Sequence, residues 1–274
     1  MVWSATEGRT RRPLPPAPAA GSVPGPRSFV GRGIVSSRGC AMIEVRRDPE
    51  IYEKAGGWFH ARWHFSFDEY HDAANMGVGT LRVFNDDRLI PGAVWPLHPH
   101  RDIEGLTYVV EGTFRHQDDV GGPPGMLPAG SVQRMTLGSG AWHSEQNGSD
   151  SEPLRFIQMW IMPAERGLPP GVEQKVFTEE DRKDRLLKVI SGDGGDAVLV
   201  HQDAAVYVSH LEPGTKVDHT FAPRHGGYLY VIDGSLRLND EKLGTGDAAK
   251  IADEPHVTLE ADAPTELILV DVAL

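Results

Sequence analysis

The chain has 274 residues, and its 27 Lys and Arg against 39 Asp and Glu give a formal net charge of −12 at pH 7. This acidic balance argues against nucleic-acid partners and membrane surfaces, since both attract cationic proteins, and no apolar run is long enough to span a membrane. The single cysteine, Cys40, cannot form an internal disulfide, so we expect a reducing, cytoplasmic environment. Any metal site must then use histidine and carboxylate ligands.

Residues 1–41 differ sharply in composition from the rest of the chain. They contain six Pro, six Gly and six Arg but one acid, Glu7, and they show no periodic apolar pattern. Such a segment cannot bury enough apolar surface to offset the entropy that ordering would cost. We therefore predict a disordered N-terminal extension over 1–41, dispensable for the folded body that begins at Met42.

From residue 42 onward, short apolar or alternating segments such as GTLRVFNDD, LRFIQMWIM and TELILVDVAL are separated by turns rich in Gly, Pro, Asn and Asp. This pattern is typical of antiparallel strands joined by hairpins. Helical periodicity is hard to find, and only two stretches, 67–74 and 172–188, suggest a short helix or turn. The sequence therefore predicts an all-β fold of the sandwich or barrel type with few short helices.

Two pairs of candidate metal ligands have the spacing of a strand. His98 and His100 lie in HPHRDIEG, and His143 and Glu145 lie in WHSEQN. Side chains at i and i+2 of a strand point to the same face, so each pair can reach one point. Glu104 has the same parity as the first pair and offers another carboxylate. Three imidazoles and a carboxylate suit Fe(II), Ni(II), Cu(II) or Zn(II), whereas Mg and Ca prefer oxygen ligands.

The second half of the chain repeats a pattern of the first. GLTYVVEGTFRH around Gly112 and GYLYVIDGSLRL around Gly234, 122 residues later, both consist of a strand, an acidic-Gly turn and another strand. A single repeat at this distance predicts two similar barrels rather than a solenoid. We place their boundary at MPAERGLPPG, which breaks regular structure, and so divide the body into 42–165 and 166–274.

The second barrel lacks the metal-binding pattern. The same shift of 122 residues places other residue types at the positions of His98, His100 and Glu104, namely Thr220, Ala222 and Gly226. His219 and His225 lie nearby but out of register, and a slip of one residue turns a side chain to the opposite face of a strand. His256 stands alone. We therefore expect one metal per chain, in the first barrel.

The histidine motifs resemble those of the cupin superfamily. Gly92, His98, His100 and Glu104 follow its first motif, with the closing Gly112 one residue late, and Gly130 to Asn147 follow its second, with a longer start and no proline. These departures are typical of pirins. HPHRDIEGLTYVVEGTFRHQDD, GSVQRMTLGSGAWHSEQN and the preceding HFSFDEYHDAANMGVGTLRVFNDD resemble the bacterial pirin family over most of 42–165, and more faintly to the C-terminus.

The resemblance implies a bicupin: a metal-binding N-terminal pirin domain over 42–165 and a C-terminal cupin-like domain without metal over 166–274. The pirin ligand set corresponds here to His98, His100, His143 and Glu145, and the metal is usually iron, Fe(II), with Cu, Ni, Mn or Zn as alternatives. A generic cupin would use Glu104 instead of Glu145. Strand parity allows either acid, and the pirin-like HSE segment favours Glu145, with Glu104 behind the ligands or facing the core.

The resemblance also implies a function. Some bacterial pirins are quercetinases, so we expect a quercetin 2,3-dioxygenase that opens flavonols with O2, with Glu145 accepting the flavonol hydroxyl proton. Apolar walls would hold the flat rings, and Met76, Phe84 and Phe114 are candidates for them, although each is more often an ordinary core residue. The alternative is a non-enzymatic, metal-dependent regulator that binds a partner protein through the same ligands. A sugar-isomerase type of cupin would not explain the HSE and HFSF segments. The expected partners are a flavonol-like small molecule and O2, and we expect a monomer.

Overall fold

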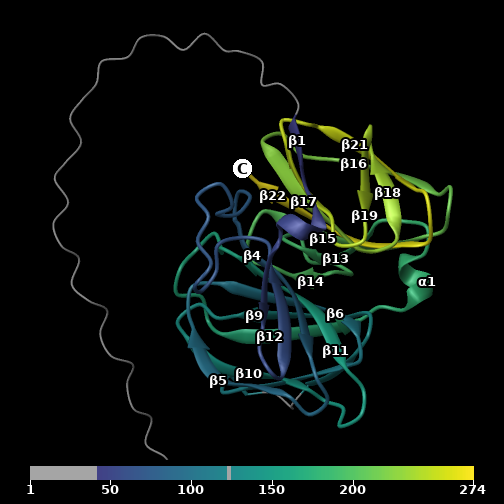
Figure 1. Ribbon diagram of the computed structural model, residues 1–274. Helices are drawn as coiled ribbons and strands as arrows, with labels where there is room; N and C mark the ends of the chain where they lie inside the picture. Colours follow the sequence, from purple (N-terminus) through teal and green to yellow (C-terminus); the bar gives the residue numbers. More distant parts are fainter. Residues whose placement is uncertain (1–41, 122–124) are drawn as a thin grey trace, which may run out of the picture. The chain divides into compact units, whose positions relative to one another are not determined.

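The computed structural model describes residues 42–121 and 125–274, and these form almost nothing but strands (Figure 1). The predicted all-β fold with two barrels is confirmed. The predicted disordered extension, residues 1–41, lies outside the described residues. In the part of the chain that the structure describes, no helix has the length and apolar character needed to cross a membrane.

Helices are short and few, as predicted, and of the two stretches expected to form a short helix or turn, one is helical and the other contains turns. The stretch 172–188 contains α1 (Glu179–Arg182), which Thr178 begins by accepting a hydrogen bond from the Asp181 backbone N–H, a capping box. A single 3-10 turn, η1 (Asp48–Glu50), precedes the first barrel. The stretch 67–74 forms an isolated bridge between Phe67 and Tyr70 instead of a helix.

The first barrel consists of a large and a small antiparallel sheet. The large sheet has seven strands, in neighbour order β12 (Gly171–Val176), β9 (Ser131–Thr136), β6 (Glu104–Glu111), β11 (Leu154–Ile161), β4 (Leu81–Leu89), β3 (Phe59–Trp63) and β2 (Tyr52–Ala55). The small sheet has four, in the order β5 (Val94–His100), β10 (Ala141–Asn147), β7 (Thr113–Asp118) and β8 (Gly125–Pro128).

The second barrel has the same plan of seven strands and four. Its large sheet runs β1 (Met42–Arg46), β20 (Ala248–Ala252), β17 (His225–Asp233), β22 (Thr265–Ala273), β15 (Ala204–Leu211), β13 (Leu187–Ser191) and β14 (Val198–Leu199). Its small sheet runs β16 (Lys216–Thr220), β21 (His256–Ala261), β18 (Ser235–Leu238) and β19 (Glu241–Gly244). Both barrels fall within one compact unit.

The two glycines of the sequence repeat occupy equivalent places. Gly112 joins β6 to β7 and Gly234 joins β17 to β18, in each case where the chain leaves the large sheet for the small one. Their φ angles are +80° and +91°, and a Cβ would lie 2.2 Å from the Pro153 carbonyl oxygen or 2.1 Å from that of Pro264. Only glycine combines this conformation with so close an approach of another backbone.

Two strands, β1 and β12, each belong to the barrel that the division at residue 165 does not assign to them. β1 pairs with β20 of the second barrel, whereas β12 pairs with β9 of the first. In Figure 1 the purple β1 accordingly lies among green and yellow strands. The division into 42–165 and 166–274 stays a prediction, and these two strands cross it.

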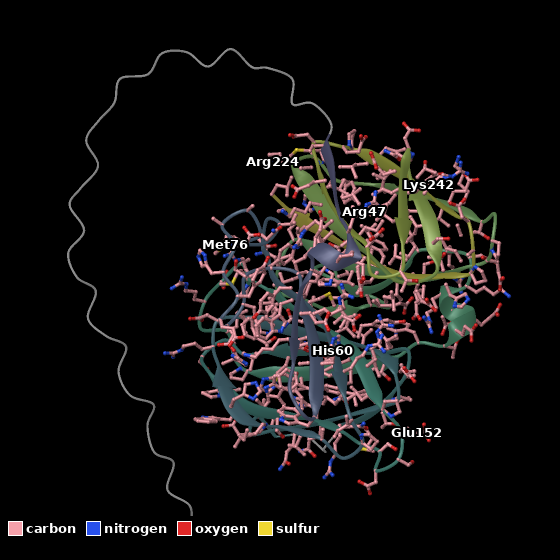
Figure 2. All side chains as sticks on the ribbon, in the orientation of Figure 1. Arg47, His60, Met76, Glu152, Arg224 and Lys242 are labelled. Carbon is pink, nitrogen blue, oxygen red and sulfur yellow. The ribbon has the colours of Figure 1, made fainter. Side chains whose placement is uncertain are left out.

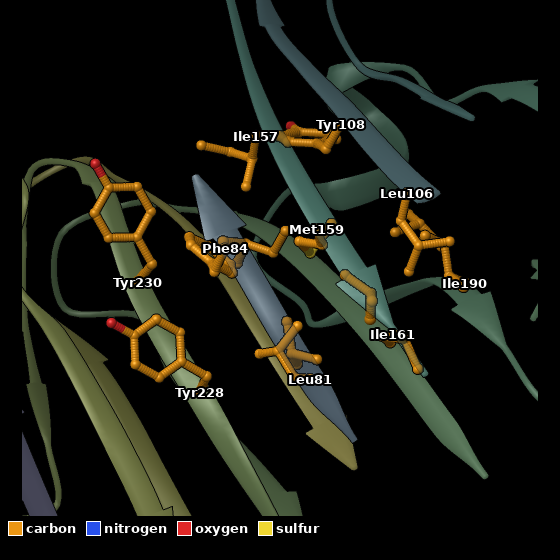
Figure 3. Packing of buried hydrophobic residues seen from close by; sticks show 14 of the residues in the cluster. Leu81, Phe84, Leu106, Tyr108, Ile157, Met159, Ile161, Ile190, Tyr228 and Tyr230 are labelled. Carbon is orange, nitrogen blue, oxygen red and sulfur yellow. The ribbon is translucent and has the colours of Figure 1, made fainter. Parts of the chain in front are cut away.

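The large sheets of the two barrels share a core. Residues of β4, β6 and β11 form one apolar cluster with residues of β15, β17 and β22, and Figure 3 shows Phe84 and Met159 in it together with Tyr228 and Tyr230. The phenols in this cluster are hydrogen-bonded: Tyr108 donates to Glu266 at 2.8 Å and Tyr230 to Asp86 at 2.6 Å. Such pairing is what a buried hydroxyl needs to avoid a desolvation penalty.

The interiors of the two barrels differ. The second barrel is filled by fourteen buried apolar residues from both of its sheets, among them Leu229, Ile251, Leu259 and Leu269. The first barrel has smaller clusters, one around Phe114 and Phe156 and one around Met135 and Leu137, and retains a cavity of about 620 Å³. The described part of the first barrel therefore has room for a ligand in its interior, whereas that of the second is packed.

Asp86 is the charged group at the centre of the contact between the barrels. It is 2% exposed, and its carboxylate accepts hydrogen bonds from Arg155 Nη2 and Tyr230 Oη, both at 2.6 Å. Burial alone would raise the pKa of Asp86, but the hydrogen bonds and charge of Arg155, with the Tyr230 hydroxyl, outweigh it and hold the pKa below its ordinary value.

Replacing Asp86 should therefore destabilise the protein in a pH-dependent way. Asp86→Asn leaves Arg155 without its counter-charge, and we expect a loss of about 2–4 kcal/mol in unfolding free energy, on the order of 5–15 °C in Tm. Because the folded-state pKa is lowered, the wild-type advantage is present above about pH 4 and should shrink as pH falls through the folded pKa. Thermal unfolding of both proteins between about pH 3 and pH 7 measures this. Glu53→Gln, at an exposed pair with His60 (Figure 2), is the control and should leave Tm nearly unchanged.

Candidate metal centre

Three histidines converge at one end of the cavity. His98 and His100 lie two apart on β5, and the pairing of β5 with β10 places His143 directly opposite His98. One ring nitrogen from each of the three lies within 4.8 Å of the others. The predicted cluster of imidazoles is thus present in the fold, and among the described residues it is the only group of His, Cys, Asp and Glu that meets this distance.

Hydrogen bonding at His98 and burial at His100 and His143 favour metal ligation by these imidazoles. The Pro96 carbonyl oxygen lies 2.7 Å from His98 Nδ1, which places the proton on Nδ1 and leaves Nε2 free to coordinate. Burial, together with the neighbouring histidines, lowers the pKa of His143 to about 2, and burial with His98 lowers that of His100 to about 4. Neutral imidazoles are the form that metal ligation requires.

A divalent transition metal fits these residues. His143 Nε2 is buried and has no hydrogen-bond partner among the described residues, and an acceptor left unpaired in this way costs free energy unless something binds it. A bound cation would satisfy this nitrogen together with those of His98 and His100. Three imidazole nitrogens favour a metal such as Fe, Ni, Cu or Zn over Mg or Ca.

Glu145 lies in the same cavity as the imidazoles. It lies two residues after His143 on β10, pairs with Trp95 beyond a one-residue bulge in β5, and is 7% exposed. Burial raises the pKa of its carboxyl to about 7. Its oxygens are not part of the group of three that meets the 4.8 Å distance, so its role as fourth ligand stays a prediction.

Glu104 faces away from the metal centre. It begins β6 and shares a face of the large sheet with Leu106 and Tyr108, the face that packs against the second barrel. Its carboxylate accepts a hydrogen bond from Thr136 at 3.2 Å and lies 3.3 Å from His201 Nδ1. This geometry therefore does not support the generic cupin ligand set, in which Glu104 would bind the metal. The hydrogen bond that orients the His98 imidazole comes from the Pro96 carbonyl oxygen and not from Glu104.

His116 is a neighbour of the metal centre that the sequence analysis missed. It lies on β7 opposite Glu145, and its ring centre is 5.6 Å from that of His143. Its Nδ1 is 3.3 Å from the Asp118 carboxylate, its Nε2 is buried without a partner among the described residues, and burial lowers its pKa. The signal in the sequence was the i, i+2 spacing of His116 and Asp118, the same spacing that marked the ligand pairs.

The walls of the cavity are aromatic, but not through the residues that were predicted. Besides the metal centre, the lining includes Phe59, Trp63, Phe67, Trp95 and Trp160, with Lys54, Asp68 and Arg82 as charged members. The prediction of Met76, Phe84 and Phe114 as walls is wrong. Phe84 and Phe114 are packed in apolar cores, and Met76 is 38% exposed at the outside of the molecule (Figure 2).

Among the described residues of the second barrel, no three His, Cys, Asp or Glu side chains form a group with the spacing of the metal centre. His219 Nε2 and His225 Nδ1 are hydrogen-bonded to the two oxygens of Asp271, at 2.8 and 2.7 Å. His256 is exposed, and its partner is Asp218 at 3.4 Å. Asp271 thus engages one ring nitrogen of each histidine, in a barrel whose interior is filled.

The fold and this centre together define a cupin-type protein with one histidine cluster in its described residues, and comparison with known proteins identifies its family. Residues 45–161 match the family described as Pirin, and residues 188–272 match the Quercetinase C-terminal cupin domain. The chain belongs to the pirin family, as its motifs predicted.

Similar proteins span nearly the same length. The quercetin 2,3-dioxygenase of Escherichia coli is 38% identical over 232 residues, which cover 84% of this chain and 99% of that protein. A pirin-like protein of Caulobacter vibrioides is also 38% identical, over 82% and 99% of the two chains. The crystal structure of the bacterial pirin YhhW from Escherichia coli in complex with nickel(II) matches with a TM-score of 0.78 and 37% identity, over 85% of this chain and 99% of that one.

The two acids should differ in their effect on metal binding. Glu145→Gln keeps the size of the side chain but removes a charge beside the imidazoles, so we expect metal affinity to fall by more than the roughly 10- to 100-fold typical of residues behind a metal's ligands. Glu104→Gln should keep its metal and lower Tm instead, because it alters the bonds to Thr136 and His201. Metal content and competitive chelator titration measure the first effect, and thermal unfolding the second. A Glu104→Gln protein without metal beside a fully loaded Glu145→Gln protein would reverse the assignment.

Metal stoichiometry should be one per chain. His143→Ala should abolish binding, whereas His219→Ala should leave the metal content unchanged, because Asp271 already occupies the second-barrel histidines. Elemental analysis of the purified proteins after saturation with metal and desalting gives the numbers. Two equivalents in the wild type, falling to one in His219→Ala, would show a second site.

Proposed function

We propose that the chain is a metal-dependent dioxygenase of the pirin family that opens flavonols with O2, the quercetin 2,3-dioxygenase reaction. The observation that carries this proposal is the aromatic cavity in the first barrel, with three imidazoles and a buried carboxylate in its lining. Cavities of this size suit small organic molecules. The names of the relatives agree with the proposed reaction.

The residues of the metal centre would have two roles: to hold a cation and to accept a proton. His98, His100, His143 and Glu145 would hold one divalent ion, for which we propose Fe(II). When bound, the ion would supply Lewis-acid and O2 chemistry. The carboxylate of Glu145 would accept the proton of a flavonol hydroxyl.

The walls would hold and shield the flavonol. Trp95 packs edge-on against Trp58, with ring centres 5.1 Å apart, and Trp160 packs against His100 at 4.7 Å. Rings fixed in this way offer flat apolar surfaces to a flat ligand and keep water from the reacting carbon atoms. A regulator that only binds a partner protein would need the same metal ligands, but it would not need this cavity. The cytoplasmic location and the monomeric state stay predictions.

Oxygen uptake tests the proposal. The iron-loaded protein should consume about one O2 for each quercetin that disappears, followed with an oxygen electrode and by flavonol absorbance. His98→Ala should lose both metal and activity, and Glu53→Gln, an exposed change outside the cavity, should retain both. A fully metal-loaded wild type that consumes no O2 with any flavonol would contradict the enzymatic function and favour the regulatory one.

A further inference from the structure

Two paired strands present different faces to the cavity and to the second barrel. On β4, Asn85 and Asp87 line the cavity, whereas Phe84 and Asp86 contact the second barrel. On β11, Gln158 lies directly opposite Asn85 in the ladder and lines the cavity as well. These three side chains form a polar strip, Asn85–Asp87–Gln158, on an otherwise largely aromatic wall.

The polar strip is buried and incompletely hydrogen-bonded. Asn85, Asp87 and Gln158 are 3%, 5% and 7% exposed. The amide oxygen of Asn85 and one carboxylate oxygen of Asp87 have no hydrogen-bond partner among the described residues. Gln158 Oε1 accepts from the Thr107 hydroxyl at 2.8 Å, which fixes the amide and leaves its NH2 group as the donor on the cavity side.

Buried polar groups without hydrogen-bond partners cost free energy in the folded protein. Nearly all buried polar side chains in proteins are hydrogen-bonded, and each exception is costly unless a ligand or water completes it. Asp86, the neighbour on the other face, shows the contrast, because its carboxylate is fully engaged by Arg155 and Tyr230. The strip differs from a structural network because the two unpaired oxygens of Asn85 and Asp87 bond to nothing in the described part of the chain.

We propose that Asn85, Asp87 and Gln158 bind hydroxyl groups of the ligand that do not coordinate the metal, so that the site selects polyhydroxylated aromatic molecules. This inference rests on the proposed function and adds the substrate class to it. An aromatic wall alone binds rings with little regard to their hydroxyl groups. A wall with unpaired acceptors disfavours a ring without donors, because the acceptors then stay buried and unpaired.

Two flavonols that differ in their hydroxyl groups test the strip. Quercetin has hydroxyl groups beyond the metal-chelating one, and 3-hydroxyflavone has none. Binding is measured with zinc-loaded protein, which is redox-inert, through quenching of the fluorescence of Trp63, Trp95 and Trp160 in the cavity wall. Wild type should bind quercetin more tightly, by roughly 10-fold or more.

Variants of the strip should remove this selectivity without removing the metal. Asn85→Leu and Asp87→Leu keep the size of the side chain and should weaken quercetin binding roughly 10- to 100-fold, while the Kd of 3-hydroxyflavone changes less than about 3-fold. Asp87→Asn, which retains a hydrogen-bonding group, should recover part of the loss. In the iron-loaded enzyme the same changes should raise KM for quercetin more than they lower kcat. Asp86→Asn is the matched control and should lower Tm but keep the selectivity.

The outcomes separate this inference from the proposed function. Equal binding of both flavonols by wild type, an equal loss for both in the variants, or a loss of metal in Asn85→Leu and Asp87→Leu would overturn the role of the strip, even if quercetin is oxidised. Selective binding that the strip variants abolish, without O2 uptake by the iron-loaded wild type, would support the strip and contradict the oxygenase function.

Discussion

The pairing of β4 with β11 is the constraint on which both halves of the molecule depend. Because successive side chains of a strand point to opposite faces, one face of this pair supplies Phe84 and Met159 to the core between the barrels. The other face supplies Asn85 and Gln158 to the cavity. A slip of one residue would place Asp86 in the cavity and Asp87 against Tyr230. The bond between Asp86 and Tyr230 fixes the register and thereby the wall of the site.

The two barrels show how one plan of strands supports different chemistry. Both have a sheet of seven strands and a sheet of four. In both, the chain passes from the large sheet to the small one at a glycine, where no larger residue fits. They differ in what fills the interior. Leucine, isoleucine and valine fill the second barrel, and Asp271 pairs with its histidines. In the first barrel, imidazoles and polar side chains replace part of this apolar filling. Its apolar clusters are smaller, and a cavity remains.

The sequence was most informative about side chains that lie on the same face of a single strand. His98 and His100 were found because strand periodicity places them on one face, and the same holds for His143 and Glu145. The wall residues were missed because composition does not reveal which face of β4 points inward, so Phe84 was assigned to the wrong side. The exchange of β1 and β12 between the barrels was also missed, since pairing between distant strands leaves no local pattern.

Glu104 shows that the rule placing residues i and i+2 on the same face holds only within a single strand. It is an even number of residues from His98 and His100, but three residues of loop separate it from β5, and it begins β6 in the other sheet. There it shares the face of Leu106 and Tyr108, and its Oε2 is engaged by Thr136 and His201. An acid that ties the first barrel to a residue of the second cannot also reach a metal inside the first. The buried carboxylates that do line the cavity with the imidazoles are Glu145 and Asp87, and of these two Glu145 shares strand β10 with His143.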